Sequence, residues 1–305
     1  MLVKKIAPIC LFVYDRLDHT RQTVEALKQN FLAQESELVI YSDAAKSKYN
    51  FHKVEEVRQY IREIEGFKSI CIVEREMNFG LAKSIIDGVT KIINNSGRVI
   101  VLEDDIVTSP YFLKFMNEAL IYYQNDEKII SVTGHVFPME GELPETFFLR
   151  DPGCWGWATW KSSWELFEPD GRKLLLEIKR KKLESEFNFE GSYNYIKMLK
   201  SQIAGKNDSW AVRWYASAFI NNKLTLYPGR SLVQNIGNDG SGTHGGNSQH
   251  LYGFVSNTPI KINEIDVKEN IYVRSILIDY LINIGDGRLL ILYRKILRLL
   301  SKILA

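Results

Sequence analysis

Residues Val99-Ile100-Val101-Leu102-Glu103-Asp104-Asp105 join an apolar run to three consecutive acids. The β-branched run is typical of a buried strand, and open α/β sheets bind ligands at the carboxyl ends of such strands. Adjacent carboxylates repel one another unless a cation compensates, and Mg²⁺ or Mn²⁺ shared with substrate phosphates would do so. The stretch therefore predicts a metal site for a nucleotide diphosphate. A solvated acidic turn before a helix that begins near Ser109 is the alternative interpretation.

The sequence before this stretch alternates strands and helices. Apolar runs predict strands over 9–14, 38–41, 69–73 and 99–102, and helical spacing predicts helices over 20–32, 52–64 and 81–94. Such alternation is typical of a parallel sheet covered by helices. Polar residues follow each predicted strand, so we expect them to gather at one edge of the sheet.

The second half differs in composition and holds all six tryptophans, between residues 155 and 214. Trp155, Trp157 and Trp160 either stack on sugar faces or belong to the core, and we expect Trp157 and Trp160 on one face of a helix. A glycine-rich stretch over 235–246 follows. It is either a lid that reorders around a ligand or an ordinary surface loop.

Composition excludes several classes of protein. The 305 residues include 39 Lys and Arg against 37 Asp and Glu, so the net charge of +2 predicts no nucleic-acid partner. Cys10 and Cys71 fall in predicted buried strands and Cys154 stands apart, which favours a reducing compartment without disulfides. The amino-terminal segment is interpreted as a first strand rather than a signal peptide. No run reaches the roughly 18 apolar residues of a membrane span.

The last residues, 288–305, form a separate pattern. Arg294, Arg298 and Lys302 are spaced by four among Leu and Ile, which predicts an amphipathic helix with a cationic stripe. Such a helix suits an anionic bilayer surface. The alternative is a helix that packs on the rest of the chain or on a partner subunit, with its charges solvated.

Five motifs in order justify a family resemblance. They are Val13-Tyr14-Asp15-Arg16, Ser42-Asp43, Asn78-Phe79-Gly80-Leu81-Ala82-Lys83-Ser84, Leu102-Glu103-Asp104-Asp105 and Gly156-Trp157-Ala158-Thr159-Trp160. Over roughly residues 5–245 the chain resembles GT-A-fold glycosyltransferases that use nucleotide sugars. It is similar to bacterial transferases of surface polysaccharides and, more remotely, to N-acetylglucosaminyltransferase I.

The resemblance implies an architecture. The fold would be α/β, a GT-A (Rossmann-like) mostly parallel sheet flanked by helices. The transferase domain would cover residues 1–255, with a nucleotide-binding half over about 1–135 and an acceptor half over about 136–255. Residues 256–305 would form a C-terminal helical extension.

The resemblance also implies roles for individual residues. Arg16 would touch the nucleotide, and Asp43 would accept a hydrogen bond from its base. Asp105 would bind the metal, Mn²⁺ or Mg²⁺. The chain departs from the common Asp-x-Asp pattern because Glu103 comes first. This leaves open which acids of the triplet contact the ribose and sugar and which binds the metal. The remaining donor-binding candidates are Asn78, Gly80, Lys83, Glu103 and Asp104.

An inverting transfer also needs a base outside the triplet that reaches the acceptor hydroxyl. Asp208, in Asn207-Asp208-Ser209-Trp210, resembles the catalytic aspartate of inverting relatives. The alternative role for Asp208 is to cap a helix over 209–220, and Glu165 and Asp151 are the other candidate bases. His244 either completes the metal shell, contacts the diphosphate or is a solvated loop residue.

The predicted function is metal-dependent transfer of a sugar, from a UDP-sugar in the first place, to a saccharide or lipid-linked acceptor in surface polysaccharide synthesis. The predicted location is the cytoplasm, peripheral at the inner face of the cell membrane. A nucleotidyltransferase is the alternative enzyme, although the chain lacks an early glycine-rich phosphate loop. An inactive sugar- or lipid-binding scaffold is the alternative from another class.

Overall fold

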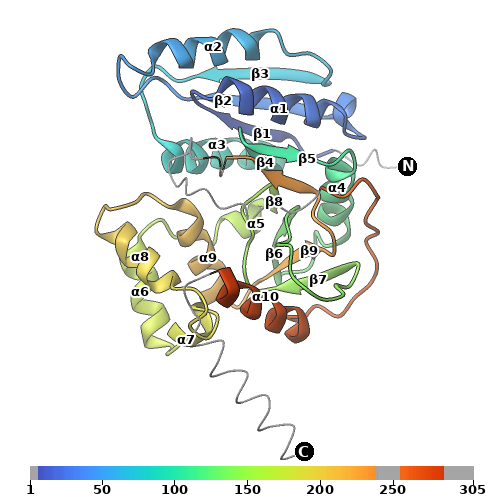
Figure 1. The fold of residues 1–305 in the computed structure, drawn as a ribbon, viewed down its shortest axis with the longest axis vertical. Coiled ribbons are helices and arrows are strands. Elements are labelled where there is room, and N and C mark those ends of the chain that lie inside the picture. The colour runs from blue at the N-terminus through green and yellow to red at the C-terminus, as the bar shows by residue number, and fades with distance from the viewer. Residues whose placement is uncertain (1–5, 238, 240–254, 285–305) are drawn as a thin grey trace, which may run out of the picture.

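The computed structural model describes residues 6–237, 239 and 255–284. An eight-stranded sheet in the order β3-β2-β1-β4-β8-β6-β9-β7 forms its centre (Figure 1). All strands except β7 and β8 run in one direction. The strands are β1 (Ile9–Val13), β2 (Glu37–Ser42), β3 (Ser69–Glu74), β4 (Arg98–Glu103), β6 (Ile129–Thr133), β7 (Thr146–Leu149), β8 (Trp157–Trp160) and β9 (Leu224–Pro228).

The first half alternates strands and helices as predicted, with boundaries shifted by a few residues. Side chains of β1 alternate between the two faces: Leu11 packs in one core with α1, α2 and α4, and Phe12 packs in another with α3. Helices therefore cover both faces, and the predicted α/β fold with a mostly parallel sheet is confirmed. These helices are α1 (Leu17–Lys28), α2 (Phe51–Arg62), α3 (Leu81–Ser96) and α4 (Phe112–Tyr122), with a short 3₁₀ turn η1 (Ala33–Glu35) after α1.

The second half adds helices and a small ribbon to this sheet. A two-stranded antiparallel ribbon pairs β5 (Ile106–Thr108) with β10 (Val233–Asn235), directly after the acid triplet. A third core forms around the later helices and the β7 and β9 strands. The helices are α5 (Lys161–Trp164), α6 (Gly171–Arg180), α7 (Glu184–Phe187), α8 (Tyr195–Ile203), α9 (Trp210–Ile220) and α10 (Ile271–Ile284).

The placement of the tryptophans corrects one prediction. Trp157 and Trp160 lie on strand β8, between β4 and β6, and not on a helix. Three residues apart on a strand, they point to opposite faces, so Trp157 packs with Trp164, Trp210 and Trp214 while Trp160 joins the other core. Pairing on both sides of β8 outweighs the helical spacing, and neither side chain is available to stack on a sugar.

Cys71 also differs from its prediction. It lies on β3, the edge strand of the sheet, and is exposed, whereas Cys10 on β1 is buried. An edge strand is paired on one side and covered less completely than a central strand, which explains the exposure.

The C-terminal part of the described chain packs on the second half. Val273, Leu277 and Leu281 of α10 are buried in the core formed with α6, α8 and α9. Among the residues described, no helix is long and apolar enough to cross a membrane. The predicted amphipathic helix over 288–305 lies outside them.

Candidate functional site

Two acids at the carboxyl end of β4 hold an arginine from the neighbouring strand. Arg16 follows β1, and its Nη2 donates to Oδ2 of Asp105 at 2.8 Å and also to the Asp104 carboxylate. The hydroxyl of Thr23 donates to the backbone carbonyl of Asp104 at 2.8 Å. Because the parallel strands β1 and β4 are direct neighbours, residues that follow them meet at one edge. The structure thus brings together Arg16, Asp104 and Asp105, as predicted.

The protonation of the triplet is set by its burial. Burial raises the pKa of Glu103 to about 8, and repulsion by Asp105 and Asp104 adds to the shift. Burial also raises the pKa of Asp104 to about 6, although Arg16 acts against this shift. Burial and the neighbouring carboxylates therefore favour the protonated form of the Glu103 carboxyl group, and a cation bound to the triplet would act against this shift.

These acids fit a divalent ion that is shared with a substrate. Nowhere in the described part of the chain do three or more His, Cys, Asp or Glu side chains gather as a metal cage. Mg²⁺ and Mn²⁺ do not need such a cage, because one or two carboxylates together with water and phosphate oxygens complete their shell. The Arg16 guanidinium between Asp104 and Asp105 shows that a cation is accommodated there.

The β10 strand brings a glycine against the same acids. The backbone N–H of Ile236 donates to the Asp105 carbonyl at 2.8 Å, as the β5–β10 ribbon continues past Asn235. A Cβ atom at Gly237 would lie 2.1 Å from Oδ2 of Asp105. A side chain at residue 237 would therefore require the Asp105 side chain or the backbone to shift. His244 and most of the predicted lid over 235–246 lie outside the described residues.

His19 also belongs to this site, and the sequence reasoning missed it. Its Nε2 lies 3.1 Å from Oδ2 of Asp239, and a proton on this ring would act to lower the pKa of Asp104. His19 follows Arg16 by three residues in the first turn of α1, so the two side chains share one side of the helix. The three-residue spacing of Arg16 and His19 is the feature of the sequence that could have predicted this neighbour.

Asp43 holds the segment that precedes α3. Its Oδ1 accepts from the N–H groups of Ala44 at 2.9 Å and Phe79 at 2.8 Å, and its Oδ2 accepts from the N–H of Gly80 at 2.8 Å and from Asn78 Nδ2 at 3.1 Å. A carboxylate offers about four lone-pair positions, so these four donors occupy them. Gly80 has φ +73°, which favours glycine, and a Cβ there would meet nothing within 4 Å. The structure thus brings the predicted residues Asp43, Asn78 and Gly80 together. The Asp43 carboxylate already accepts its hydrogen bonds from groups of the protein itself.

Lys83 and Asp208 line one open pocket of about 540 Å³ between α3 and α9. Lys83 Nζ lies 4.1 Å from the centre of the Phe79 ring. The Asp208 side chain is 67% exposed and accepts from Arg213 Nη2 at 3.0 Å. The cap of α9 is Ser209, whose hydroxyl accepts from the Val212 N–H. The capping role considered for Asp208 therefore belongs to Ser209.

The two other candidate bases lie in different places. Glu165 is exposed after α5, which follows the far end of β8, where Trp160 pairs with Arg98 at the start of β4. Because that end is opposite the acid triplet, the structure does not bring Glu165 to the triplet. Asp151 lies between β7 and β8, and burial raises its pKa to about 7.

Comparisons with known proteins give structural matches only. No family model matches the chain, and no curated protein matches it. A structure of TarS residues 1–349 from S. aureus matches with 14% identity and a TM-score of 0.33, over 46% of this chain and 40% of that chain. A further TarS structure matches with 14% identity and a TM-score of 0.31, over 45% of this chain and 23% of that one. The mannosyltransferase PcManGT from Pyrobaculum calidifontis, in complex with GDP-Man and Mn²⁺, matches with 11% identity and a TM-score of 0.37, over 71% of each chain. This chain thus spans less than half of the matched TarS chains.

Proposed function

We propose that the protein is a metal-dependent glycosyltransferase that takes a sugar from a nucleotide diphosphate donor. The observation that carries this proposal is the pairing of Arg16 with Asp104 and Asp105 at the carboxyl edge of β4. A cation and two carboxylates at this edge are suited to a diphosphate with a divalent ion. The motifs that resemble nucleotide-sugar transferases contribute the residues of this same edge.

The donor would lie across the ends of β1, β2 and β4. Arg16 would bind a phosphate oxygen, since a guanidinium matches phosphate geometry. Asp43 would shape the site of the nucleotide's base indirectly, because it holds Asn78 and Gly80 in place. The space beside Gly80 would permit close approach of the nucleotide to the backbone. Glu103 would form a hydrogen bond with a sugar hydroxyl. We propose a UDP-sugar as the donor, on the sequence resemblance.

The metal would be held by Asp105, with His244 as a proposed second ligand. When bound, Mn²⁺ or Mg²⁺ supplies positive charge for the oxygens of the leaving diphosphate. In an inverting transfer, Asp208 would take the proton of the acceptor hydroxyl while that oxygen attacks the anomeric carbon. Support for this role is that Asp208 lies at the α9 terminus beside Lys83 and does not cap the helix.

The acceptor we propose is a saccharide, free or lipid-linked, in surface polysaccharide synthesis. The proposed place of the reaction is the cytoplasmic face of the cell membrane, and the support is the basic and apolar sequence of residues 288–305.

A donor screen tests the proposal. The purified protein is incubated with UDP- and GDP-sugars, with and without Mn²⁺, and release of the nucleoside diphosphate is measured. Metal-dependent release is expected. Release of pyrophosphate from a nucleoside triphosphate would point to a nucleotidyltransferase, and binding without any turnover would point to a scaffold.

A further inference from the structure

Arg75 follows β3, and its main chain fixes it to two neighbouring elements. Its N–H donates to the backbone carbonyl of Ser42, the last residue of β2, at 2.9 Å. Its own carbonyl accepts from Nη2 of Arg58, on α2, at 2.8 Å. Arg75 therefore extends the pairing of β2 with β3 by one residue, at the carboxyl edge where the proposed donor site lies.

The Arg75 side chain contacts three elements at once. Its guanidinium lies 4.8 Å from the centre of the Tyr41 ring on β2 and 4.3 Å from the centre of the Phe79 ring, just before α3. Its Nη2 also binds the carboxylate of Asp87 on α3. A planar guanidinium can stack on aromatic faces and pair with a carboxylate at the same time. Arg75 therefore ties the segment before α3 to a strand and to the helix.

Tyr41 is the rigid end of this contact. Its ring stacks on Phe12 of β1, with the ring centres 5.4 Å apart. Helix α3 comes so close at Gly88 that a Cβ there would lie 2.8 Å from the Phe12 ring and 3.0 Å from the Tyr41 ring. Tyr41 is thus packed between the sheet and α3, and it is the support against which Arg75 is held.

Phe79 is the other end of the contact, and it belongs to the proposed donor site. Its N–H donates to the Asp43 carboxylate at 2.8 Å, and its neighbours Asn78 and Gly80 bind the same carboxylate. Nζ of Lys83 lies 4.1 Å from the centre of the Phe79 ring. The ring that the guanidinium contacts is therefore adjacent, in sequence or in space, to three of the predicted donor-binding residues.

Stability alone does not account for an arginine at this position. The Arg75 side chain is 8% exposed, and its buried Nε has no hydrogen-bond partner among the residues described. A buried donor without a partner costs free energy, and apolar side chains of similar volume often replace a buried ion pair without loss of stability. The arginine is therefore explained better by the segment it holds than by its contribution to folding.

The ion pair with Asp87 keeps the guanidinium in place. Burial acts to raise the pKa of Asp87, but hydrogen bonds from Arg75 and Lys91 outweigh this effect and lower that pKa. Asp87 is therefore ionised at neutral pH, and it fixes one end of the guanidinium to α3.

We propose that Arg75 is a positioning residue of the donor site. It holds Phe79 against β2 and α3, and it thereby keeps residues 78–80 in the conformation that meets the nucleotide. A segment that is already ordered loses less conformational entropy when a ligand binds. This inference rests on the proposed donor site and names the residue that preorganises it, and Arg75 acts without touching the substrate.

Nucleotide affinity of the full chain tests this role. UDP and GDP are titrated by calorimetry with and without Mn²⁺, and the nucleotide that the wild-type protein binds more tightly is used throughout. Arg75→Lys keeps a positive charge beside Asp87 and loses the planar group that contacts the rings. We expect it to weaken nucleotide binding about tenfold, because residues 78–80 must then become ordered on binding. The fold-increase in affinity on addition of Mn²⁺ should stay at the wild-type value, since Asp104 and Asp105 are unchanged.

A second substitution shows whether Arg75 acts through Phe79. Phe79→Leu removes the ring and should weaken nucleotide binding by a similar factor, whereas Phe79→Tyr keeps the ring and should bind close to the wild-type affinity. Because Arg75→Lys and Phe79→Leu break the same contact, the double variant should lose no more affinity than the weaker-binding single variant. A loss equal to the product of the two single losses would overturn the proposal.

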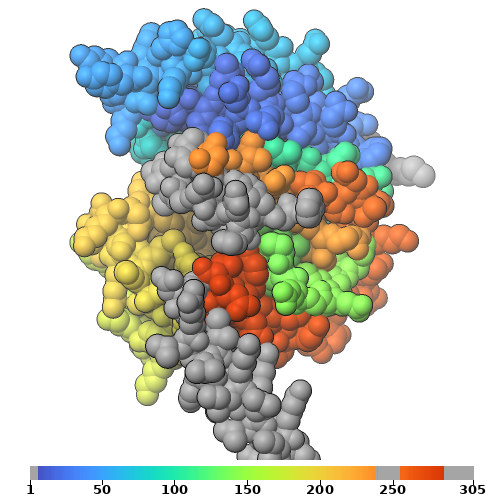
Figure 2. Space-filling view, viewed as in Figure 1, coloured from blue at the N-terminus to red at the C-terminus, as the bar shows by residue number. Residues whose placement is uncertain are grey.

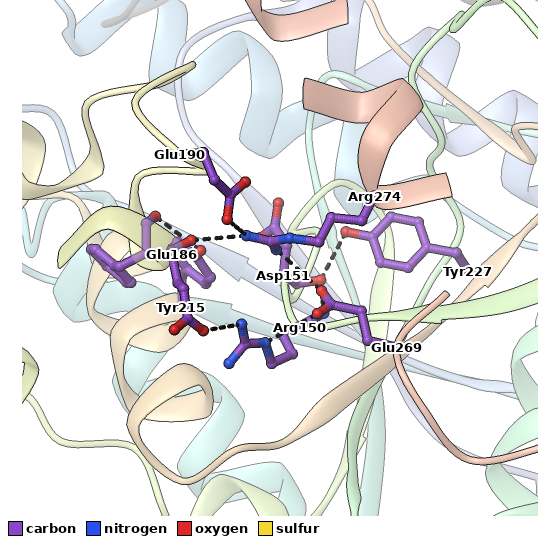
Figure 3. Close-up of polar contacts among 9 residues, drawn as sticks. Arg150, Asp151, Glu186, Glu190, Tyr215, Tyr227, Glu269 and Arg274 are labelled. Carbon is purple, nitrogen blue, oxygen red and sulfur yellow. Dashed lines mark hydrogen bonds and ion pairs between the residues drawn. The ribbon is translucent and has the colours of Figure 1, made fainter. Parts of the chain in front are cut away.

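Arg274 offers a matched control in the later half of the chain. Its guanidinium lies 4.7 Å from the centre of the Phe189 ring, and it binds Glu190 at 2.9 Å and Glu269 at 3.2 Å (Figure 3). Its side chain is 9% exposed, so it is buried to nearly the same degree as Arg75. Figure 2 shows the blue first strands and the red α10, which carries Arg274, on different parts of the molecule. Arg274→Lys should therefore lower the free energy of unfolding and leave nucleotide affinity unchanged.

Urea unfolding of each variant separates positioning from folding. A residue with only a structural role lowers the free energy of unfolding and leaves the nucleotide affinity of the folded protein unchanged. Wild-type affinity in folded Arg75→Lys would therefore overturn the proposal, and so would a smaller effect of Mn²⁺, which would place the change at the metal. If Arg75→Lys does not fold, Asp87→Asn decides, because it loses the charge that holds the guanidinium and should also weaken nucleotide binding.

The wild-type titration separates this inference from the proposed function. Binding of neither nucleotide by the wild-type protein would reject the proposed donor site and the positioning role with it. Binding by the wild-type protein, with equal affinity in Arg75→Lys or, failing that variant, in Asp87→Asn, would reject the positioning role alone.

Discussion

Gly237 lies against Asp105 so closely that a Cβ atom would come within 2.1 Å of the carboxylate Oδ2. The same Cβ would lie 2.9 Å from Nη1 of Arg16. A single added methyl group would therefore push against both partners of the central ion pair. The path of the chain after β10 and the position of the proposed metal ligand are thus linked by geometry.

Gly237→Ala should weaken Mn²⁺-dependent UDP binding by about tenfold or more, because Asp105 or the backbone must shift. Isothermal titration calorimetry with and without Mn²⁺ measures the effect. Gly205→Ala is the control for backbone strain alone, since its φ of +68° disfavours alanine but its Cβ would meet nothing within 4 Å, whereas the effect at residue 237 comes from the close contact. Equal nucleotide affinity in the two variants would show that the close approach at residue 237 does not shape the site.

Asp208→Asn should leave donor affinity nearly unchanged and lower turnover by about 10²-fold, because the variant keeps the shape of the side chain and loses the base. The measurement is steady-state transfer kinetics with donor and acceptor varied separately. Glu165→Gln, at the other edge of the sheet, should transfer at the wild-type rate. A wild-type rate in Asp208→Asn would remove Asp208 from the mechanism and favour a retaining reaction.

Stability should fall in mild acid because of His135. Burial lowers the pKa of His135 to about 3, and its ring packs 4.5 Å from Trp155. The unfolded state therefore binds more protons than the native state between about pH 3 and pH 6.5, so this contribution to stability is complete above that range and is lost as pH falls through it. His135→Phe should lose less stability than wild type between pH 7 and pH 5.

Urea unfolding at the two pH values provides the comparison, and His52→Gln, an exposed histidine, is the control. If wild type and His135→Phe lose equal stability, the buried imidazole does not set the acid sensitivity.

Residues 288–305 should bind an anionic membrane surface, because Arg294, Arg298 and Lys302 are spaced by four among Leu and Ile. Liposome co-sedimentation compares the full chain with a chain that ends at Gly287. The full chain should pellet with anionic vesicles, less so as salt rises, because screening acts over about 8 Å at physiological ionic strength. Equal pelleting of both chains would contradict the prediction, and unfolding of the shorter chain would support a packing role.

The first half of the fold could be predicted because each apolar run and each helical spacing agreed with its final place. Strand β8 could not, since Trp157 and Trp160 satisfy a helical spacing, and only pairing with β4 and β6 decides their conformation. Local pattern carries no information about such partners. The predicted side chains of the donor edge were brought together because they follow neighbouring parallel strands.

The contacts within the site were less accessible to sequence reasoning. Two backbone N–H groups on Phe79 and Gly80 bind the Asp43 carboxylate, and backbone donors have no sequence signature. The contact between Gly237 and Asp105 joins positions far apart in the chain through the β5–β10 ribbon.

Calorimetry on Asp105→Ala tests the central claim, that this edge binds a nucleoside diphosphate together with a divalent ion. The variant should fold, because removal of one acid from a repulsive cluster does not require a loss of stability. Asp266→Asn, which changes an exposed acid that forms an ion pair with Lys268, is the matched control. The account predicts that Mn²⁺ strengthens UDP binding to the wild-type and control proteins and has no effect on Asp105→Ala. An unchanged Mn²⁺ requirement and unchanged UDP affinity in folded Asp105→Ala would contradict it.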